Sequence, residues 1–134
     1  MRVNLLAVLV SGVAIFILGG LWYSPLLFAK RWVALLGKSE AELKSAGATP
    51  LMYLTVFVCG LLTAFCLAVI INHFGHLTPL RGAMIGGFCW VGLTGATSFG
   101  NALFSMKPRE LWMIDSGYNL VSFVLAGIIL AAWR

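Results

Sequence analysis

The sequence has few charged residues, and acidic residues are the rarest of them. Of its 134 residues, 10% are charged, only 4 are Asp or Glu, and 61% are hydrophobic. Soluble globular domains carry roughly 25% charged residues, so this composition excludes an ordinary soluble domain. The mean hydropathy of +1.01 indicates a protein of the lipid bilayer. The net charge of +5 is typical of basic loops beside anionic lipid headgroups and does not call for a nucleic-acid partner.

Cysteines and catalytic motifs are also scarce. The three cysteines, Cys59, Cys66 and Cys89, all lie within apolar runs. An odd number of cysteines in such surroundings predicts neither a disulfide framework nor a metal site. The sequence contains no Gly-x-Ser-x-Gly motif, no phosphate-binding glycine loop and no zinc-binding pattern. We therefore expect no metal and no cofactor, and enzymatic function has no support from the sequence.

Long apolar runs make up most of the chain. A helix needs roughly 20 apolar residues to cross a hydrocarbon core of about 30 Å, and four runs reach that length, at residues 3–23, 51–72, 80–106 and 110–133. They predict an all-α fold, a four-helix transmembrane bundle that forms a single membrane domain over residues 1–134. The first run lacks a small-x-small cleavage site, so we expect it to be retained and not removed as a signal peptide.

The only long connection, residues 25–47, joins the first two spans. Its first half places Phe28 and Trp32 on one helical face and basic residues on the other. This pattern predicts an amphipathic helix that lies flat at the membrane surface, and the alternative is a helix packed on the end of the bundle. A capping box at residues 39–42 predicts a second, short helix closed by Gly47. The residues expected to contact the interface and lipid headgroups are Trp22, Tyr23, Lys30, Arg31 and Trp32.

The distribution of basic residues predicts the orientation. Loops one and three hold six of them, and the termini with loop two hold three. The positive-inside rule places the more basic loops in the cytoplasm and both termini outside. The six are Lys30, Arg31, Lys38, Lys44, Lys107 and Arg109.

One acidic residue, Asp115, lies inside an apolar run. A carboxylate in hydrocarbon is costly unless it is paired, hydrated or protonated, so it marks the first place to look for function. It lies roughly 9 Å past the predicted helix start. One role is a structural anchor paired with a basic residue such as Lys107, Lys30 or Arg31, and the other is binding of a proton, cation or polar substrate. Residues near it on the same or the adjacent helix complete a candidate polar cluster of Asp115, Asn119, Asn101, Tyr118 and Ser122.

Small residues are concentrated in the third run. They form two stripes at helical spacing, which predict faces where another helix backbone approaches closely. This helix is expected to be central, and such faces also suit contact between copies in a homo-oligomer. The helix-packing residues are Gly82, Gly86, Gly92, Ala96 and Gly100.

Three stretches carry a resemblance to a known family. They are the Trp22-Tyr23-Ser24-Pro25 element with its flanks, the glycine-rich third run that ends at 100–104, and residues 114–118 followed by 126–130. Over essentially its whole length the chain resembles a family of small bacterial four-helix integral membrane proteins known as a domain of unknown function. The resemblance implies a four-helix fold in the bacterial inner (plasma) membrane and implies no activity. In the family pattern Asn can stand at the position of Asp115, which favours a hydrogen-bonding role there.

These features predict a small polytopic membrane protein that acts as an oligomeric channel or transporter for a small solute or ion. The alternative is a non-transporting membrane module that binds lipid or a partner protein through its basic amphipathic segment. The expected partners are the lipid bilayer and further copies of the chain, with no nucleic acid. A lipid- or quinone-modifying enzyme ranks last, because the sequence shows no acid–base pair or metal set.

Overall fold

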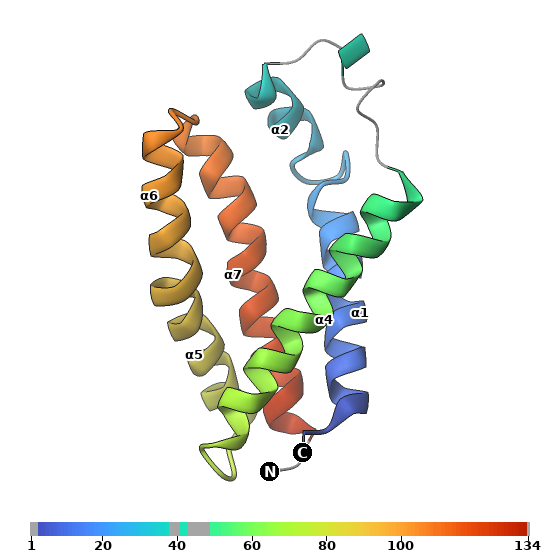
Figure 1. Ribbon diagram of the computed structural model, residues 1–134, viewed down its shortest axis with the longest axis vertical. Coiled ribbons are helices and arrows are strands. Elements are labelled where there is room, and N and C mark those ends of the chain that lie inside the picture. The colour runs from blue at the N-terminus through green and yellow to red at the C-terminus, as the bar shows by residue number, and fades with distance from the viewer. Residues whose placement is uncertain (1–2, 38–40, 43–48, 134) are drawn as a thin grey trace.

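The computed structural model describes residues 3–37, 41–42 and 49–133, and these are almost entirely helical (Figure 1). The predicted all-α class is confirmed, with no strand among the described residues. The elements in order are α1 (Leu5–Trp22), α2 (Ala29–Leu36), α4 (Pro50–Asn72), α5 (Pro79–Cys89), the π-helix η1 (Trp90–Gly95), α6 (Ala96–Phe104) and α7 (Arg109–Ala132).

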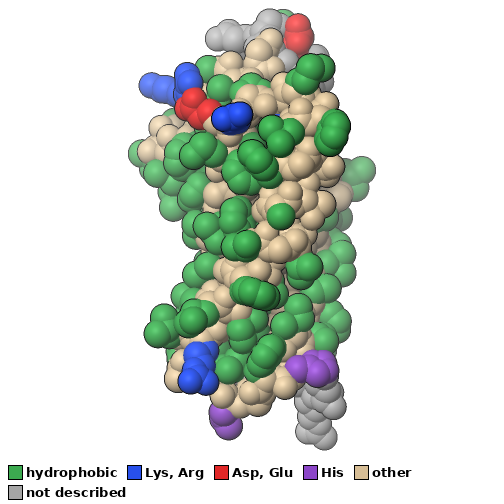
Figure 2. All heavy atoms as spheres, turned by 90° about the vertical axis from the view of Figure 1, so that its left-hand side faces the viewer, with side chains coloured by type: hydrophobic (Ala, Val, Ile, Leu, Met, Phe, Trp, Pro, Cys, Tyr) green, Lys and Arg blue, Asp and Glu red, His purple; other side chains and the backbone are tan. Residues whose placement is uncertain are grey.

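Three of these helices, α1, α4 and α7, are long and apolar enough to cross a membrane. Their outward faces are apolar as well: Leu54 and Leu62, on α4, are 58% and 60% exposed. On the face shown in Figure 2, a broad hydrophobic band separates charged side chains at one end from basic and histidine side chains at the other. An exposed apolar surface of this extent marks contact with a membrane or another protein, and with the three apolar helices it supports a transmembrane protein.

Local sequence signals explain where the helices begin. The Thr49 hydroxyl accepts a hydrogen bond from the Met52 amide, and Thr78 does the same for Arg81, at 3.2 Å in both cases. A proline follows each threonine in the first turn, where its missing N–H costs nothing. At the other end of α2, Gly37 adopts a left-handed conformation with φ 66°, which stops the helix.

The third predicted run, residues 80–106, is not a single α-helix. The chain stays helical from Pro79 to Phe104 but passes through the π-helix η1 between α5 and α6. Within η1 the Trp90 ring lies over Gly95, where an added Cβ would stand 3.0 Å from the ring. A π-helical turn widens the helix and is frequent at functional sites.

Helices α5 and α7 are in backbone contact. A Cβ added at Gly82 would lie 2.2 Å from the Gly127 carbonyl oxygen, and one at Gly86 would lie 2.2 Å from the Phe123 carbonyl oxygen. The second stripe of small residues, Gly92, Ala96 and Gly100, faces outward. An added Cβ at Gly92 or Gly100 meets nothing within 4 Å, and Ala96 is exposed.

The apolar core occupies the half of the bundle near the chain termini. Ala64, Leu67 and Ile71 of α4 pack there with Ala126 and Leu130 of α7, all at most 4% exposed. The two termini meet at this end, where the Asn4 amide donates to the Trp133 carbonyl at 3.2 Å (Figure 1). The polar groups of the bundle gather at the opposite end.

Helix α2 lies at that opposite end and is packed against the start of α7 (Figure 1). It is shorter than the predicted 25–47 segment, because residues 24–28 form turns before it begins. Of the short helix expected after residue 38, only residues 41–42 are described, and they are helical. Gly47 and the rest of that segment lie outside the described residues.

Candidate functional site

Asp115 joins three elements of the fold through one carboxylate oxygen. Its Oδ1 accepts a hydrogen bond from the Tyr23 hydroxyl at 2.6 Å and another from Trp32 Nε1 at 3.1 Å. Tyr23 directly follows α1, and Trp32 lies on α2. The sequence suggested a basic partner for this carboxylate, but in the structure its partners are an aromatic hydroxyl and an indole. The orientation of α2 explains this, since its Trp32 turns toward α7 while Lys30 and Arg31 remain exposed.

The Tyr23 hydroxyl is held as a hydrogen-bond donor. Burial, together with the hydrogen bond to the Asp115 carboxylate and its negative charge, raises the pKa of Tyr23 well above its usual value of 10.0. The phenol therefore stays protonated at neutral pH and donates to Asp115. A charge-assisted bond of this kind is stronger than one between neutral groups.

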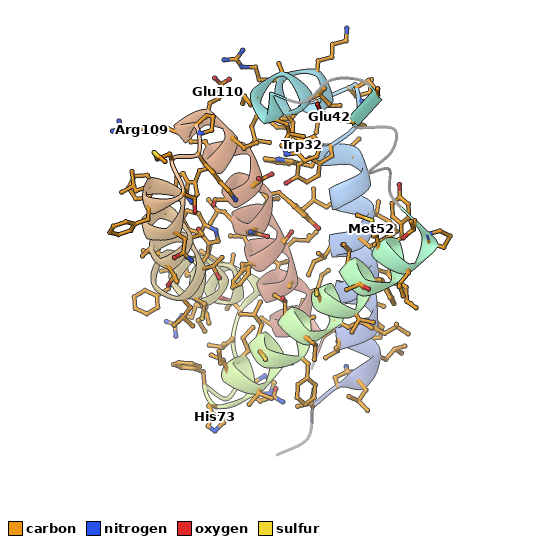
Figure 3. The ribbon with its side chains drawn as sticks, turned by 45° about the horizontal axis from the view of Figure 1, so that its top comes forward. Trp32, Glu42, Met52, His73, Arg109 and Glu110 are labelled. Atoms are coloured by element: carbon orange, nitrogen blue, oxygen red, sulfur yellow. The ribbon has the colours of Figure 1, made fainter. Side chains whose placement is uncertain are left out.

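Arg31 is engaged by a different acid. Its guanidinium binds both carboxylate oxygens of Glu110, at the first turn of α7. The side chains are 58% and 47% exposed, and exposed ion pairs add little to stability. Figure 3 shows Glu110 and Trp32 at the end of the bundle where α2 meets α7. The Arg31–Glu110 ion pair therefore supplements the contact that Trp32 makes between these two helices.

Aromatic side chains surround the Asp115 junction. Trp22 Nε1 donates to the Ile114 carbonyl at 2.9 Å, and the Trp22 ring lies 4.9 Å from that of Phe28. The Tyr118 ring stands edge-on to Tyr23 at 5.6 Å, and its hydroxyl donates to the Ile15 carbonyl at 3.0 Å. Trp22, Tyr23 and Trp32, which were expected at the lipid interface, are thus half-buried here and hydrogen-bonded to α7.

Two glycines make room for these rings. An added Cβ at Gly117 would lie 3.2 Å from the Trp22 ring, and one at Gly19 would lie 2.9 Å from the Tyr118 hydroxyl oxygen. The Trp22-Tyr23 and Gly117-Tyr118 pairs of the sequence therefore meet in space, although about 95 residues separate them along the chain.

A pocket of about 260 Å³ lies beside the junction, between α6 and α7. It contains Asp115, Asn119 and Asn101, three members of the predicted cluster. The other two members lie elsewhere on α7: Tyr118 faces α1, and Ser122 is buried one turn further along the helix. We call this cavity the polar pocket, and its polar lining consists mainly of Ser98, Asn101, Lys107, Asp115, Ser116 and Asn119.

Some of these polar groups are bonded to one another and others are free. Trp112 Nε1 donates to Ser98 Oγ at 3.0 Å, and Ser98 Oγ lies 3.3 Å from Ser116 Oγ. The side chains of Asn101, Lys107 and Asn119 make no hydrogen bond to any residue that the structure describes, and neither does Asp115 Oδ2. The polar pocket therefore offers two amides, one ammonium and one carboxylate oxygen to a ligand.

Sequence reasoning did not assign Ser116 and Trp112 to this site. Both were detectable in principle, because they share a helical face with Asn119, from which Ser116 is three and Trp112 seven residues away. Lys107 was predicted as a basic loop residue and as an ion-pair partner for Asp115, and not as part of this polar cluster. Its place in the pocket follows from the tight turn between α6 and α7, where Met106 has a positive φ of 56°.

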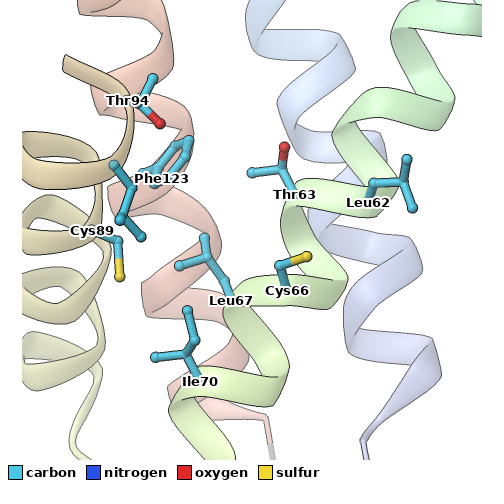
Figure 4. Close-up of a pocket in the computed structure, with 9 residues that line it drawn as sticks. Leu62, Thr63, Cys66, Leu67, Ile70, Cys89, Thr94 and Phe123 are labelled. Carbon is cyan, nitrogen blue, oxygen red and sulfur yellow. The ribbon is translucent and has the colours of Figure 1, made fainter. Parts of the chain in front are cut away.

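Two further pockets have more apolar linings than the polar pocket. One of about 390 Å³ lies between α1 and α4, and its lining includes Tyr23 and Tyr118. Another of about 280 Å³ opens between α4 and α5 (Figure 4). Its lining is almost wholly apolar, with Leu67, Ile70 and Phe123 beside the thiols of Cys66 and Cys89. The polar pocket is therefore the strongest candidate for recognition of a polar ligand.

Comparison with known proteins identifies a family. A protein-family model described as a protein of unknown function (DUF1761) matches residues 6–131 of the chain. No curated protein matches it, and no solved structure matches it.

Proposed function

The chain belongs to the DUF1761 family of proteins of unknown function, and from its structure we propose that it is a subunit of a transmembrane transporter or channel for a small polar solute or ion. The observation that carries the proposal is the polar pocket at the end of an otherwise apolar bundle, which is lined by the half-buried Asp115 and Asn119 and by the exposed Asn101 and Lys107. Polar groups at membrane depth are costly and mark solute or ion pathways.

The proposal includes four membrane crossings. The run from α5 through η1 to α6 spans roughly 35 to 40 Å at about 1.5 Å per residue, enough for a hydrocarbon core of about 30 Å. Both termini lie at one end of the bundle, as an even number of crossings requires. Lys30, Arg31, Lys107 and Arg109 belong to the opposite end, which favours a cytoplasmic polar pocket and outside termini in a bacterial inner membrane.

The proposal also includes a homo-oligomer. Below the polar pocket, the described interior of one copy is filled by side chains such as Leu67, Ile71 and Ala126, each at most 2% exposed. A solute path must therefore run between copies. The outward stripe of Gly92 and Gly100, with Ala96 between them, offers a second copy a surface for close backbone approach.

Flux into proteoliposomes tests this proposal. Asp115→Asn keeps the oxygen that accepts from Tyr23 and Trp32 but removes the charge from the polar pocket, so we expect altered flux or altered pH dependence of flux. The matched control is Glu110→Gln, which removes the other acidic charge of α7 outside the polar pocket. Unchanged flux in Asp115→Asn removes Asp115 from the mechanism. Absence of flux for every ion and small polar solute in the panel refutes transport.

A membrane module that binds lipid or a partner through the segment around α2 is the second candidate. The observation in its favour is that Leu26 and Leu27 are 82% and 50% exposed next to the exposed Lys30. Anionic lipid that copurifies with the protein should then decrease in the Leu26→Glu, Lys30→Glu double variant. Arg81→Glu, at the other end of the bundle, is the control, and equal lipid retention in both variants excludes this candidate.

A further inference from the structure

The polar pocket contains one positive and one negative side chain that do not pair with each other. Lys107 and Asp115 both line it, yet no ion pair joins these two residues. The Lys107 nitrogen and the Asp115 oxygens are therefore separated by more than the 4.0 Å of an ion pair. Opposite charges that share a cavity without contact leave space between them for a ligand that carries both complementary charges.

The neutral groups of the polar pocket are suited to the same kind of ligand. The amides of Asn101 and Asn119 each offer a donor and an acceptor, and neither is bonded to a described residue. By contrast, Ser98 already accepts a hydrogen bond from Trp112, and its Oγ lies 3.3 Å from that of Ser116. The available hydrogen-bonding capacity thus comes from the two amides, Lys107 and the free oxygen of Asp115.

The volume of the polar pocket, which is partly open to its surroundings, sets the scale of the group that fits inside it. About 260 Å³ corresponds to roughly nine water molecules, at about 30 Å³ of liquid volume each. This space accommodates a ligand of about ten non-hydrogen atoms, the size of an amino acid or of a phosphoethanolamine group.

We propose that the polar pocket binds a small zwitterion, whose primary ammonium donates to Asp115 Oδ2 and whose anionic group is bound by Lys107. The inference rests on the proposed function and names its substrate class. Asn101 and Asn119 hydrogen-bond the polar atoms between the two charges. A primary ammonium is specified, because a quaternary ammonium has no N–H to donate to the carboxylate.

This chemistry has two sources. Asp115 lies about 9 Å from the start of α7, close to the depth of the lipid headgroups, so the zwitterion is either the headgroup of phosphatidylethanolamine or a free molecule of the same chemistry. Both present a primary ammonium and a phosphate or carboxylate a few bonds apart. The experiment is designed to tell these two sources apart.

Ligand binding to the full-length protein is measured by thermal stabilisation in detergent and by titration. The probes are phosphoethanolamine, its separate halves ethanolamine and inorganic phosphate, and phosphocholine as the quaternary analogue. In parallel, nanodiscs of mixed phosphatidylethanolamine and phosphatidylcholine are used, and the lipid retained by the protein is measured by mass spectrometry. The variants are Lys107→Gln and Asp115→Asn, with Arg109→Gln as a basic control that does not line the polar pocket.

We expect either phosphoethanolamine or retained phosphatidylethanolamine to be preferred by about tenfold over the halves and over the choline analogue, or about 1.4 kcal/mol. Lys107→Gln and Asp115→Asn should each remove that preference, and Arg109→Gln should leave it within about twofold. Binding of the free compound alone identifies a soluble zwitterion, and enrichment of the lipid alone identifies the headgroup.

Three results overturn the inference. These are equal affinity for one half and for the whole zwitterion, equal loss in Arg109→Gln and Lys107→Gln, and absence of both binding and lipid enrichment. The flux assay separates this failure from that of the proposed function. Flux that responds to Asp115→Asn without zwitterion binding retains transport and rejects the substrate class, whereas zwitterion binding without any flux rejects transport and retains the site.

Discussion

The contact between α5 and α7 predicts opposite outcomes for two adjacent glycines. At Gly86 an added Cβ would lie 2.2 Å from the Phe123 carbonyl oxygen and 2.8 Å from its carbonyl carbon. At Gly87 the nearest atom is Val124 Cγ2 at 3.8 Å, an ordinary van der Waals distance. We therefore compare Gly86→Ala with Gly87→Ala, which make the same chemical change one residue apart on the same helix.

The difference in stability follows from these distances. Ordinary contact begins at 3.4 Å, so Gly86→Ala requires α5 and α7 to move about 1.2 Å apart, and the obstacle is backbone that no rotamer change can move. Overpacking of this kind typically costs about 1–3 kcal/mol. Replacement of a helical glycine by alanine gains up to about 1 kcal/mol of helix propensity in both variants, so the difference between them isolates the clash.

Unfolding in mixed micelles of mild detergent and SDS, followed by tryptophan fluorescence, measures this difference. We expect Gly87→Ala to be as stable as the parent protein or more so, and Gly86→Ala to be less stable than Gly87→Ala by about 1–3 kcal/mol. Gly82→Ala should resemble Gly86→Ala, since its Cβ would lie 2.2 Å from the Gly127 carbonyl oxygen. Equal stability of Gly86→Ala and Gly87→Ala would refute the close contact between α5 and α7.

Other contacts give further predictions, each testable by the same unfolding assay. Tyr23→Phe removes a donor to the Asp115 carboxylate and should cost about 1–2 kcal/mol, and equal stability would contradict the hydrogen bond. Because the pKa of Tyr23 is raised in the folded state, the unfolded chain loses this proton first, and stability should fall as pH rises above 10.0; Tyr23→Phe should lose less stability over that range. Ser11 is fully buried and its Oγ has no partner among the described residues, so Ser11→Ala should retain stability or gain up to about 1 kcal/mol, and a clear loss would indicate a missing partner. Arg31→Gln should lower stability slightly in low salt and not at all in high salt, since the ion pair is exposed, and a loss that persists in high salt would contradict this.

The helices that were predictable from the sequence are those whose ends are set by local signals. The run predicted at 51–72 is the helix Pro50–Asn72, because apolar length and the Thr49-Pro50 cap both act within one helix. α1 and α7 were predictable from the length of their apolar runs, that of α7 even with Asp115 inside it. Helical spacing was also sufficient to place Asp115 and Asn119 on one face of α7, and both line the polar pocket.

Features that depend on distant residues were not predictable in this way. The π-helix η1 accompanies the packing of Trp90 over Gly95 and beside Trp112, which is a tertiary contact that the apolar pattern of the third run does not encode. The donors to Asp115 lie 92 and 83 residues earlier in the chain. The amphipathic pattern of residues 25–37 identified Trp32 as apolar-facing, but it could not show that the indole N–H would reach a carboxylate on α7.

The two roles considered for Asp115 are combined in one side chain. Oδ1 binds Tyr23 and Trp32 and so connects α1 and α2 to α7, whereas Oδ2 remains available to the polar pocket. A cationic ligand group at Oδ2 draws on the same negative charge that strengthens both hydrogen bonds at Oδ1, so ligand binding and the docking of α2 are thermodynamically linked. Linkage is reciprocal, and therefore whatever factor the ligand imposes on α2 docking, α2 docking must impose on ligand affinity. The junction that stabilises this end of the bundle is thus also the element through which the proposed zwitterion would affect the position of α2.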